Sequence, residues 1–137
     1  MFSHVTVGTN SLERALAFYE PLMAELGLIC KFREAHWVGW MQPGVDRPLF
    51  MINLPYDDNP ATIGNGQMVA FVAKTRDSVD RFHALAVRQG GTCEGPPGLR
   101  PQYHADYYGA YVRDPDGNKL CICCHEPTIR ATHKEID

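Results

Sequence analysis

The stretch from Tyr103 to His125 constrains the fold more than any other part of the chain. Two β-prone runs, 107–113 and 119–125, flank the five residues DPDGN at 114–118. Proline favours a φ of about −65° and glycine tolerates positive φ, so this segment predicts a tight hairpin turn. Side chains alternate between the two faces of a strand. The second run therefore presents three potential ligands on one face: Cys121, Cys123 and His125.

The composition is typical of one compact domain. The chain has 137 residues, of which 45% are hydrophobic and 21% charged. A net charge of −3 and the lack of a Lys/Arg run argue against nucleic acid or a membrane surface as a partner. We find no long apolar run and no basic-then-apolar N-terminus, so we expect a cytoplasmic protein. Five cysteines, two of them adjacent, indicate reduced thiols.

The first half of the chain predicts a strand, a helix and three further strands. The strand 2–8 carries His4, and the residues Asn10 to Glu13 have the spacing of a capping box with Asn10 as the N-cap. The helix should end at Gly27, and Pro21 should kink or split it. Three β-like runs follow, at 28–33, 37–41 and 48–53.

The second half repeats this order. A linker rich in Pro, Asp, Asn and Gly precedes a strand at 66–74, a cap pattern at Asp77 to Asp80, and a helix ending at Gly90. Because the order of strand, cap, helix and glycine recurs, we predict two copies of a βαβββ unit. The predicted boundaries are 1–54 for the first module, 55–65 for the linker, 66–125 for the second module and 126–137 for a polar tail.

The segment from Gly95 to Tyr108 is predicted to be a loop at the lip of a pocket, because it combines three prolines, an arginine and three tyrosines. A guanidinium suits a carboxylate or phosphate, and rings suit a planar or apolar group. The alternative is that the tyrosines pack on the sheet edge. Trp37 and Phe50 form either an inner aromatic wall or a dimer interface. The candidate ligand-binding residues of the loop are Arg100, Tyr103, His104, Tyr107 and Tyr108.

The chain resembles the glyoxalase, bleomycin-resistance and extradiol-dioxygenase superfamily, the vicinal oxygen chelate proteins, over nearly its whole length. Three segments carry the resemblance: HVTVGTNSLERALAFYEPLMAELGL, GNGQMVAFVAKTRDSVDRFHALAVRQGG and YYGAYVRDPDGNKLCICCH. The resemblance implies an α+β fold in which two βαβββ modules form a half-barrel cup. It also implies a divalent metal held by the first and fourth strands of the modules.

Carried over by position, the implied metal ligands fall on His4, Gln67 and Cys121. The family commonly uses His at the first position, whereas His is usual in place of Gln67 and Glu in place of Cys121. The remaining position, near Met51 to Asn53, offers only an amide. Magnesium, manganese and iron(II) prefer hard oxygen and imidazole ligands, while zinc accepts sulfur and nitrogen. The cofactor is therefore either one zinc ion or none.

Cys121 itself has three interpretations. It is a zinc ligand, a small buried residue that fills the space of a lost ligand, or a reactive thiol whose pKa is lowered by a neighbour such as His4 or His125. Cys30, Cys93 and Cys124 are expected to be filler in the core or sheet.

Three functions follow. The departures from the family's ligands favour a cup that has lost its metal and binds a small apolar or aromatic compound. The first alternative is a zinc-dependent lyase or dioxygenase-type enzyme using His4, Gln67 and Cys121. The second alternative is a homodimeric binding or interaction module without catalysis, in which two chains complete each cup.

Overall fold

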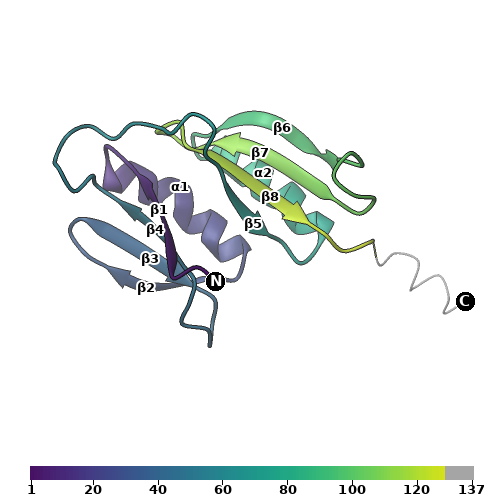
Figure 1. Ribbon diagram of the computed structural model, residues 1–137, viewed down its shortest axis with the longest axis horizontal. Coiled ribbons are helices and arrows are strands. Elements are labelled where there is room, and N and C mark those ends of the chain that lie inside the picture. Colours follow the sequence, from purple (N-terminus) through teal and green to yellow (C-terminus); the bar gives the residue numbers. More distant parts are fainter. Residues whose placement is uncertain (129–137) are drawn as a thin grey trace, which may run out of the picture.

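The computed structural model describes residues 1–128, which form two four-stranded sheets, each with one helix on one face (Figure 1). The first module contains β1 (His4–Gly8), α1 (Leu12–Glu25), β2 (Ile29–Arg33), β3 (Trp37–Met41) and β4 (Leu49–Asn53). The second module contains β5 (Val69–Val72), α2 (Arg76–Arg88), β6 (Thr92–Leu99), β7 (Tyr108–Arg113) and β8 (Lys119–Cys124).

The two sheets have the same topology. Sheet A has the order β1-β4-β3-β2 and sheet B the order β5-β8-β7-β6, and in each the first strand runs parallel to the fourth while the other pairs are antiparallel. The predicted α+β fold of two βαβββ modules is confirmed, and both sheets are open. The predicted tail falls mainly on residues 129–137, which lie outside the described residues.

Helix α1 begins one residue later than its capping pattern predicts. The N-cap is Ser11, whose hydroxyl accepts a hydrogen bond from the Arg14 N–H at 3.2 Å, so the prediction of Asn10 as the cap is wrong. The helix is also not split, since it continues through Pro21 to Glu25. It ends as predicted at Gly27, which has a φ of +74°.

Two further predictions for the second module are corrected. The N-cap of α2 is Thr75, not the Asp77 to Asp80 pattern, and its hydroxyl accepts from the Ser78 N–H at 3.1 Å. The segment from Gly95 to Tyr108 was expected to be a loop, but its first residues, up to Leu99, belong to strand β6. Its prolines are tolerated because β6 is an edge strand with register shifts at Cys93–Gly95 and Gly95–Gly98.

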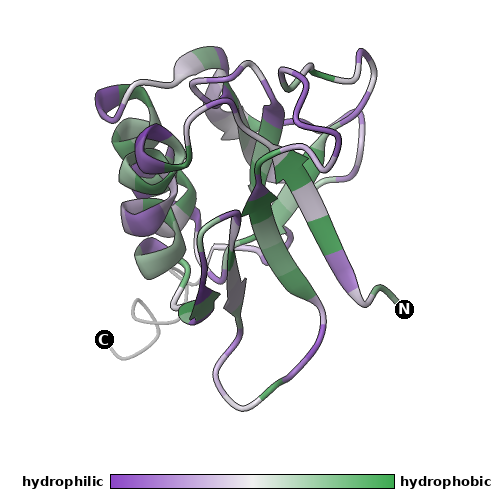
Figure 2. Cartoon of the chain, turned by 90° about the vertical axis from the view of Figure 1, so that its left-hand side faces the viewer, coloured by the Kyte–Doolittle hydropathy of each residue, from purple (hydrophilic) through white to green (hydrophobic). Residues whose placement is uncertain are grey.

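Alternate residues of the strands face the helices and build one core shared by both modules. Leu120, Ile122 and Cys124 of β8 belong to this core, and the ring centroids of Phe50 on β4 and Phe71 on β5 lie 4.9 Å apart across the modules. Figure 2 shows the helices along one side of the strands. We call the opposite side, which points away from the helices, the front face. Within residues 1–128, no helix is long and apolar enough to cross a membrane.

The β7–β8 turn joins the modules. The buried Asp114 carboxylate accepts hydrogen bonds from Tyr19 Oη at 2.6 Å and from the Asp116 and Asn118 N–H groups at 2.9 Å. Asp116 accepts from Thr9 Oγ1 and Arg14 Nη2, both at 2.6 Å. The turn of the second module therefore holds the end of β1 and the start of α1, which belong to the first module.

Replacing Tyr19 by Phe tests this junction. The Tyr19 side chain is fully buried, and loss of its hydroxyl removes one of the two donors to Oδ2 of the buried Asp114 carboxylate and leaves the Asn118 side-chain amide as the other. We expect Tyr19→Phe to lower the free energy of unfolding by about 1–3 kcal/mol, measured by urea denaturation. Tyr56→Phe, at a fully exposed tyrosine in the linker, is the matched control and should change nothing. Equal stability of the two variants would contradict the role of this hydrogen bond.

Candidate functional site

A group of polar side chains surrounds Cys121 on the front face of sheet B. The register pairs Cys121 with Tyr111, and Cys123 follows two residues later on the same side of β8. Cys121 is nevertheless fully buried, because the Tyr107 hydroxyl lies 3.4 Å from its sulfur and 3.1 Å from the Tyr111 hydroxyl. We call this group, together with His104 and His125, the thiol cluster.

Gly109 allows Tyr107 to reach the thiol. A Cβ atom at Gly109 would lie 2.8 Å from the Tyr107 ring and 3.4 Å from the Cβ of Cys123, so any larger residue would displace the ring. Tyr107 also packs edge-on against Tyr103 and His125, with ring centroids 4.9 and 5.5 Å apart. The aromatic residues before the strand thus form a cover over the two cysteines.

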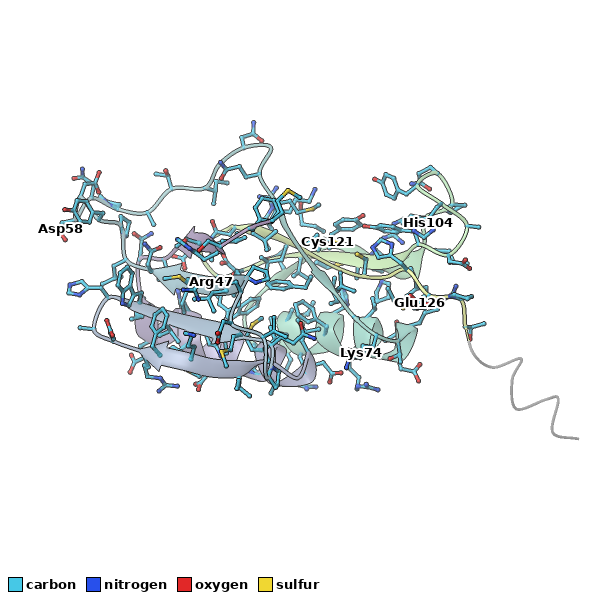
Figure 3. All side chains as sticks on the ribbon, turned by 60° about the horizontal axis from the view of Figure 1, so that its bottom comes forward. Arg47, Asp58, Lys74, His104, Cys121 and Glu126 are labelled. Atoms are coloured by element: carbon cyan, nitrogen blue, oxygen red, sulfur yellow. The ribbon has the colours of Figure 1, made fainter. Side chains whose placement is uncertain are left out.

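A chain of hydrogen bonds leads from the loop to Cys123. The Asp106 N–H donates to His104 Nδ1 at 3.2 Å, so a neutral His104 carries its proton on Nε2 and donates to His125 Nδ1 at 2.9 Å. His125 Nε2 then faces Cys123 Sγ at 3.6 Å. The two imidazoles are stacked, with ring centroids 5.1 Å apart. Figure 3 shows His104 and Cys121 over the ribbons of sheet B.

The cluster stabilises the anionic form of Cys121. Hydrogen bonding from Cys123 lowers the pKa of the Cys121 thiol to about 7, and the Tyr107 hydroxyl acts in the same direction, while burial opposes both. The same interaction raises the pKa of Cys123 well above its ordinary value. Burial is the larger cause that raises the pKa of Tyr107, and the hydrogen bond to Cys121 raises it further. As the pH rises above about 7, Cys121 is therefore the group that loses its proton, while Cys123 and Tyr107 keep theirs.

Arg100 lies beside this cluster. Its guanidinium donates to the carbonyl oxygens of Gly98 at 2.9 Å and Pro96 at 2.8 Å, and it sits 5.5 Å from the centroid of the Tyr111 ring. The backbone closes the loop through the Arg100 N–H, which donates to the Tyr107 carbonyl at 2.8 Å. Four of the predicted ligand-binding residues are thus brought together: Arg100, Tyr103, His104 and Tyr107.

The other three predicted ligand-binding residues lie elsewhere. Tyr108 faces α2, where its hydroxyl donates to Asp80 at 2.7 Å. Burial, and to a smaller extent this hydrogen bond, raises the pKa of Tyr108 to about 12. Phe50 belongs to the core on the helix side of sheet A. Trp37 is on the front face of sheet A, packs edge-on against Phe32 and donates from Nε1 to Glu34 at 2.7 Å.

Each of the three predicted metal ligands contacts other residues. The exposed His4 ring is hydrogen-bonded to its neighbour Ser3 at 2.9 Å, Gln67 packs against Gly64 in the linker, and the sulfur of Cys121 is bonded to Tyr107. Among residues 1–128, no group of three or more His, Cys, Asp and Glu side chains could hold a metal ion. The residues at the family's metal positions therefore do not fit a hard divalent cation.

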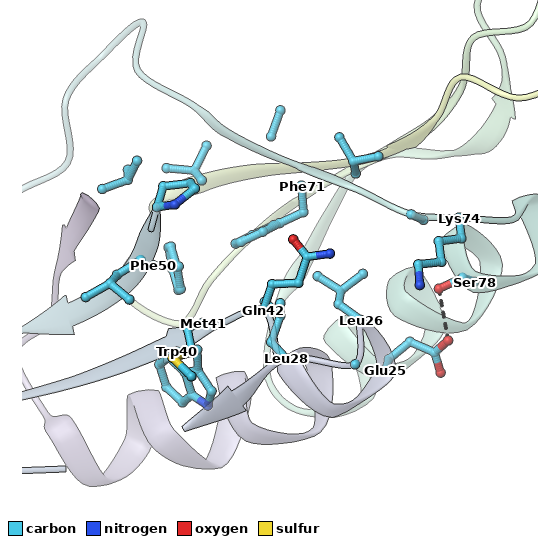
Figure 4. A pocket seen from close by; sticks show the side chains of 18 of the residues that line it. Glu25, Leu26, Leu28, Trp40, Met41, Gln42, Phe50, Phe71, Lys74 and Ser78 are labelled. Carbon is cyan, nitrogen blue, oxygen red and sulfur yellow. Dashed lines mark hydrogen bonds between the residues drawn. The ribbon is translucent and has the colours of Figure 1, made fainter. Parts of the chain in front are cut away.

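A cleft of about 1160 Å³ opens between the two modules, beside the contact of Phe50 with Phe71. One wall is the edge strand β5 with its flanking residues, so that every residue from Met68 to Thr75 contributes. The opposite wall includes Leu28, Trp40 and Phe50 (Figure 4). At one end, Glu25 accepts hydrogen bonds from the Ser78 hydroxyl at 3.0 Å and Arg81 Nε at 3.1 Å.

Sequence analysis missed Tyr111 and the cleft residues Phe71 and Lys74. The signal for Tyr111 was present, because a tight turn at 114–118 pairs the strands so that Tyr111 faces Cys121. Phe71 and Lys74 carry no such signal, since the cleft depends on how the modules pack.

The ionisation of Cys121 is measurable without chemical access to the sulfur. We expect the ultraviolet thiolate absorbance of the protein, minus that of Cys121→Ser, to titrate with a midpoint of about 7, with the thiol protonated below this pH and anionic above it. Tyr107→Phe removes one donor to the thiolate and should raise the midpoint. A difference midpoint at the ordinary value of about 8.5, unchanged in Tyr107→Phe, would contradict the geometry.

Comparisons with known proteins agree with the fold. A glyoxalase/bleomycin resistance protein from Albidiferax ferrireducens T118 is 41% identical, with a TM-score of 0.81, over 92% of this chain and 99% of that chain. A lactoylglutathione lyase from Agrobacterium tumefaciens shares 19% identity and a TM-score of 0.63, over 90% of this chain and 92% of that one, which shows similarity of fold alone. No curated protein matches. The family model matches residues 1–122, and the chain therefore belongs to the Glyoxalase/Bleomycin resistance protein/Dioxygenase superfamily.

Proposed function

We propose that this protein binds a small aromatic compound bearing a carboxylate on the front face of sheet B, without a resident metal ion. The observation that carries the proposal is the arrangement of Tyr103, Tyr107 and two imidazoles beside Arg100. Tyr103 is 62% exposed and its ring meets Tyr107 edge-on, so its own face is open to a planar ligand.

Arg100 supplies the anion contact. Its two hydrogen bonds to the carbonyl oxygens of Gly98 and Pro96 fix the guanidinium and use two of its five N–H groups, so donors remain for a carboxylate. The Cys121 thiolate limits which ligands fit, because a carboxylate placed directly over the sulfur would be repelled. A ligand with its ring over the tyrosines and its charge at Arg100 avoids that repulsion.

Thiolate-assisted catalysis is the second candidate function, favoured by the pKa of Cys121, which is about 7. A thiolate at neutral pH is a better nucleophile and base than a thiol. The cover formed by Tyr107 excludes solvent from the sulfur, so catalysis would require that ring to move. Binding requires no such movement, and we therefore place binding first.

The test is calorimetric titration of protein treated with a chelator, using a panel of substituted benzoates and the matching benzamides. We expect benzoates to bind after metal removal and Arg100→Gln to weaken them at least tenfold, since a hydrogen bond to a charged group contributes about 1.5–3 kcal/mol. Tyr103→Ala should weaken both series, and Tyr56→Ala, in the linker, is the matched control.

Elemental analysis separates this proposal from the zinc alternative. Stoichiometric zinc that disappears in His4→Ala and Cys121→Ala, together with ligand binding that requires zinc, would overturn the metal-free proposal in favour of a zinc-dependent enzyme.

We further propose that the partner is a second copy of the chain. The front faces expose apolar side chains, since Trp37 is 43% and Val72 68% exposed, and the thiol cluster is covered on its outer side by the loop alone. A front face from a second chain would bury these residues and close the ligand site, as in symmetric dimers generally.

Sedimentation velocity checks this assembly. We expect a dimer for the native chain and a monomer for Trp37→Asp, because a charge at the centre of a buried interface is not solvated. Asp in place of the exposed Val87 on α2, on the helix side, is the control and should leave the dimer intact. A native chain that sediments as a monomer at micromolar concentration would refute the assembly.

A further inference from the structure

The cleft between the modules is a second candidate site, separate from the thiol cluster. Trp40, Phe50 and Phe71 line it and retain 4%, 6% and 9% exposure, so their rings reach its surface. Met68 and Val72 line the same cleft and are 46% and 68% exposed. Apolar groups from both modules thus face one continuous space.

The shape of the cleft favours an elongated ligand. Eight consecutive residues from Met68 to Thr75 line one wall, and an extended segment of that length spans roughly 23 Å at about 3.3 Å per residue. The volume of about 1160 Å³ exceeds what a single ring would fill. Phe2 and Leu49 at one end are apolar, whereas Lys74 and Ser78 at the other are polar.

The polar end has one uncompensated charge. Glu25 is neutralised by Arg81, whose Nε lies 3.1 Å from both carboxylate oxygens, and it also accepts from Ser78. Lys74 is exposed and makes no hydrogen bond or ion pair with any residue in the range 1–128. The side-chain amide of Gln42 likewise has no partner in that range and projects between the modules (Figure 4). The cleft therefore combines long apolar walls with a free ammonium at one end.

We propose that the cleft binds an acyl-chain carboxylate, with the chain along β5 between Phe71 and Trp40 and the carboxylate at Lys74. Apolar burial supplies most of the affinity, since each buried methylene contributes about 0.8 kcal/mol. Lys74 selects for the anion through its positive charge. This site lies apart from Arg100 and Tyr103, so it is independent of the proposed function.

The test uses 8-anilinonaphthalene-1-sulfonate as a fluorescent anionic reporter, displaced by decanoate or by decanamide, which has the same chain without the charge. We expect decanoate to displace the reporter at about fivefold lower concentration than decanamide, the advantage of one exposed ion pair of about 1 kcal/mol. Lys74→Gln should abolish this preference. Arg88→Gln, at the opposite end of α2, is the matched control and should retain it.

A filling variant tests the apolar walls. Met68 is 46% exposed and lines the cleft, so Met68→Trp occupies space without a buried clash and should weaken both ligands at least tenfold. Tyr103→Ala, on the front face, should leave both affinities unchanged. Equal displacement by decanoate and decanamide in the native chain would overturn the proposal, as would unaltered affinity in Met68→Trp. Loss of decanoate binding in Tyr103→Ala would place the ligand on the thiol cluster instead, which also overturns it.

Discussion

The buried carboxylate of Asp114 is the interaction on which the arrangement of the two modules depends. Burying a charge is costly unless it is fully hydrogen-bonded, and here four donors converge on two oxygens. One donor, Tyr19, comes from the other module, and burial, reinforced by the charge of Asp114, holds the pKa of its phenol well above the ordinary value. This carboxylate lies in the β7–β8 turn. The turn therefore has two roles: it sets the register of β8 against β7, and it attaches β8 to the first module.

The same register determines which side chains lie on the front face of sheet B. Parallel pairing of β5 with β8 puts Ala70 beside Cys121, and antiparallel pairing with β7 puts Tyr111 there. A carboxylate at position 121 would present hard oxygen ligands for a divalent cation, whereas the thiolate accepts hydrogen bonds from Tyr107 and Cys123. The superfamily's fold is therefore retained with a thiol at position 121, and neutral donors stabilise the anionic form of that sulfur.

Local signals in the sequence were sufficient for most of the elements and for the repeat. The turn residues at 114–118, the alternation in β8 and the glycine after α1 each act over a few residues, so pattern reasoning found them. Strand β6 was missed because its composition is that of a turn, and only its position at the sheet edge makes two prolines acceptable. Tyr107 and Tyr108 were grouped as site residues, although Tyr107 reaches the front face and Tyr108 faces α2. Adjacent residues at a strand's start point to opposite faces.

The two candidate sites share a boundary. The sulfur of Cys123 lies 3.7 Å from the carbonyl oxygen of Phe71, and the ring of Phe71 lines the cleft. The single S–H of Cys123 thus has two acceptors, this carbonyl and the Cys121 sulfur that it helps to ionise. The thiol cluster and the cleft are separate in their ligands, but the backbone of one edge strand connects them.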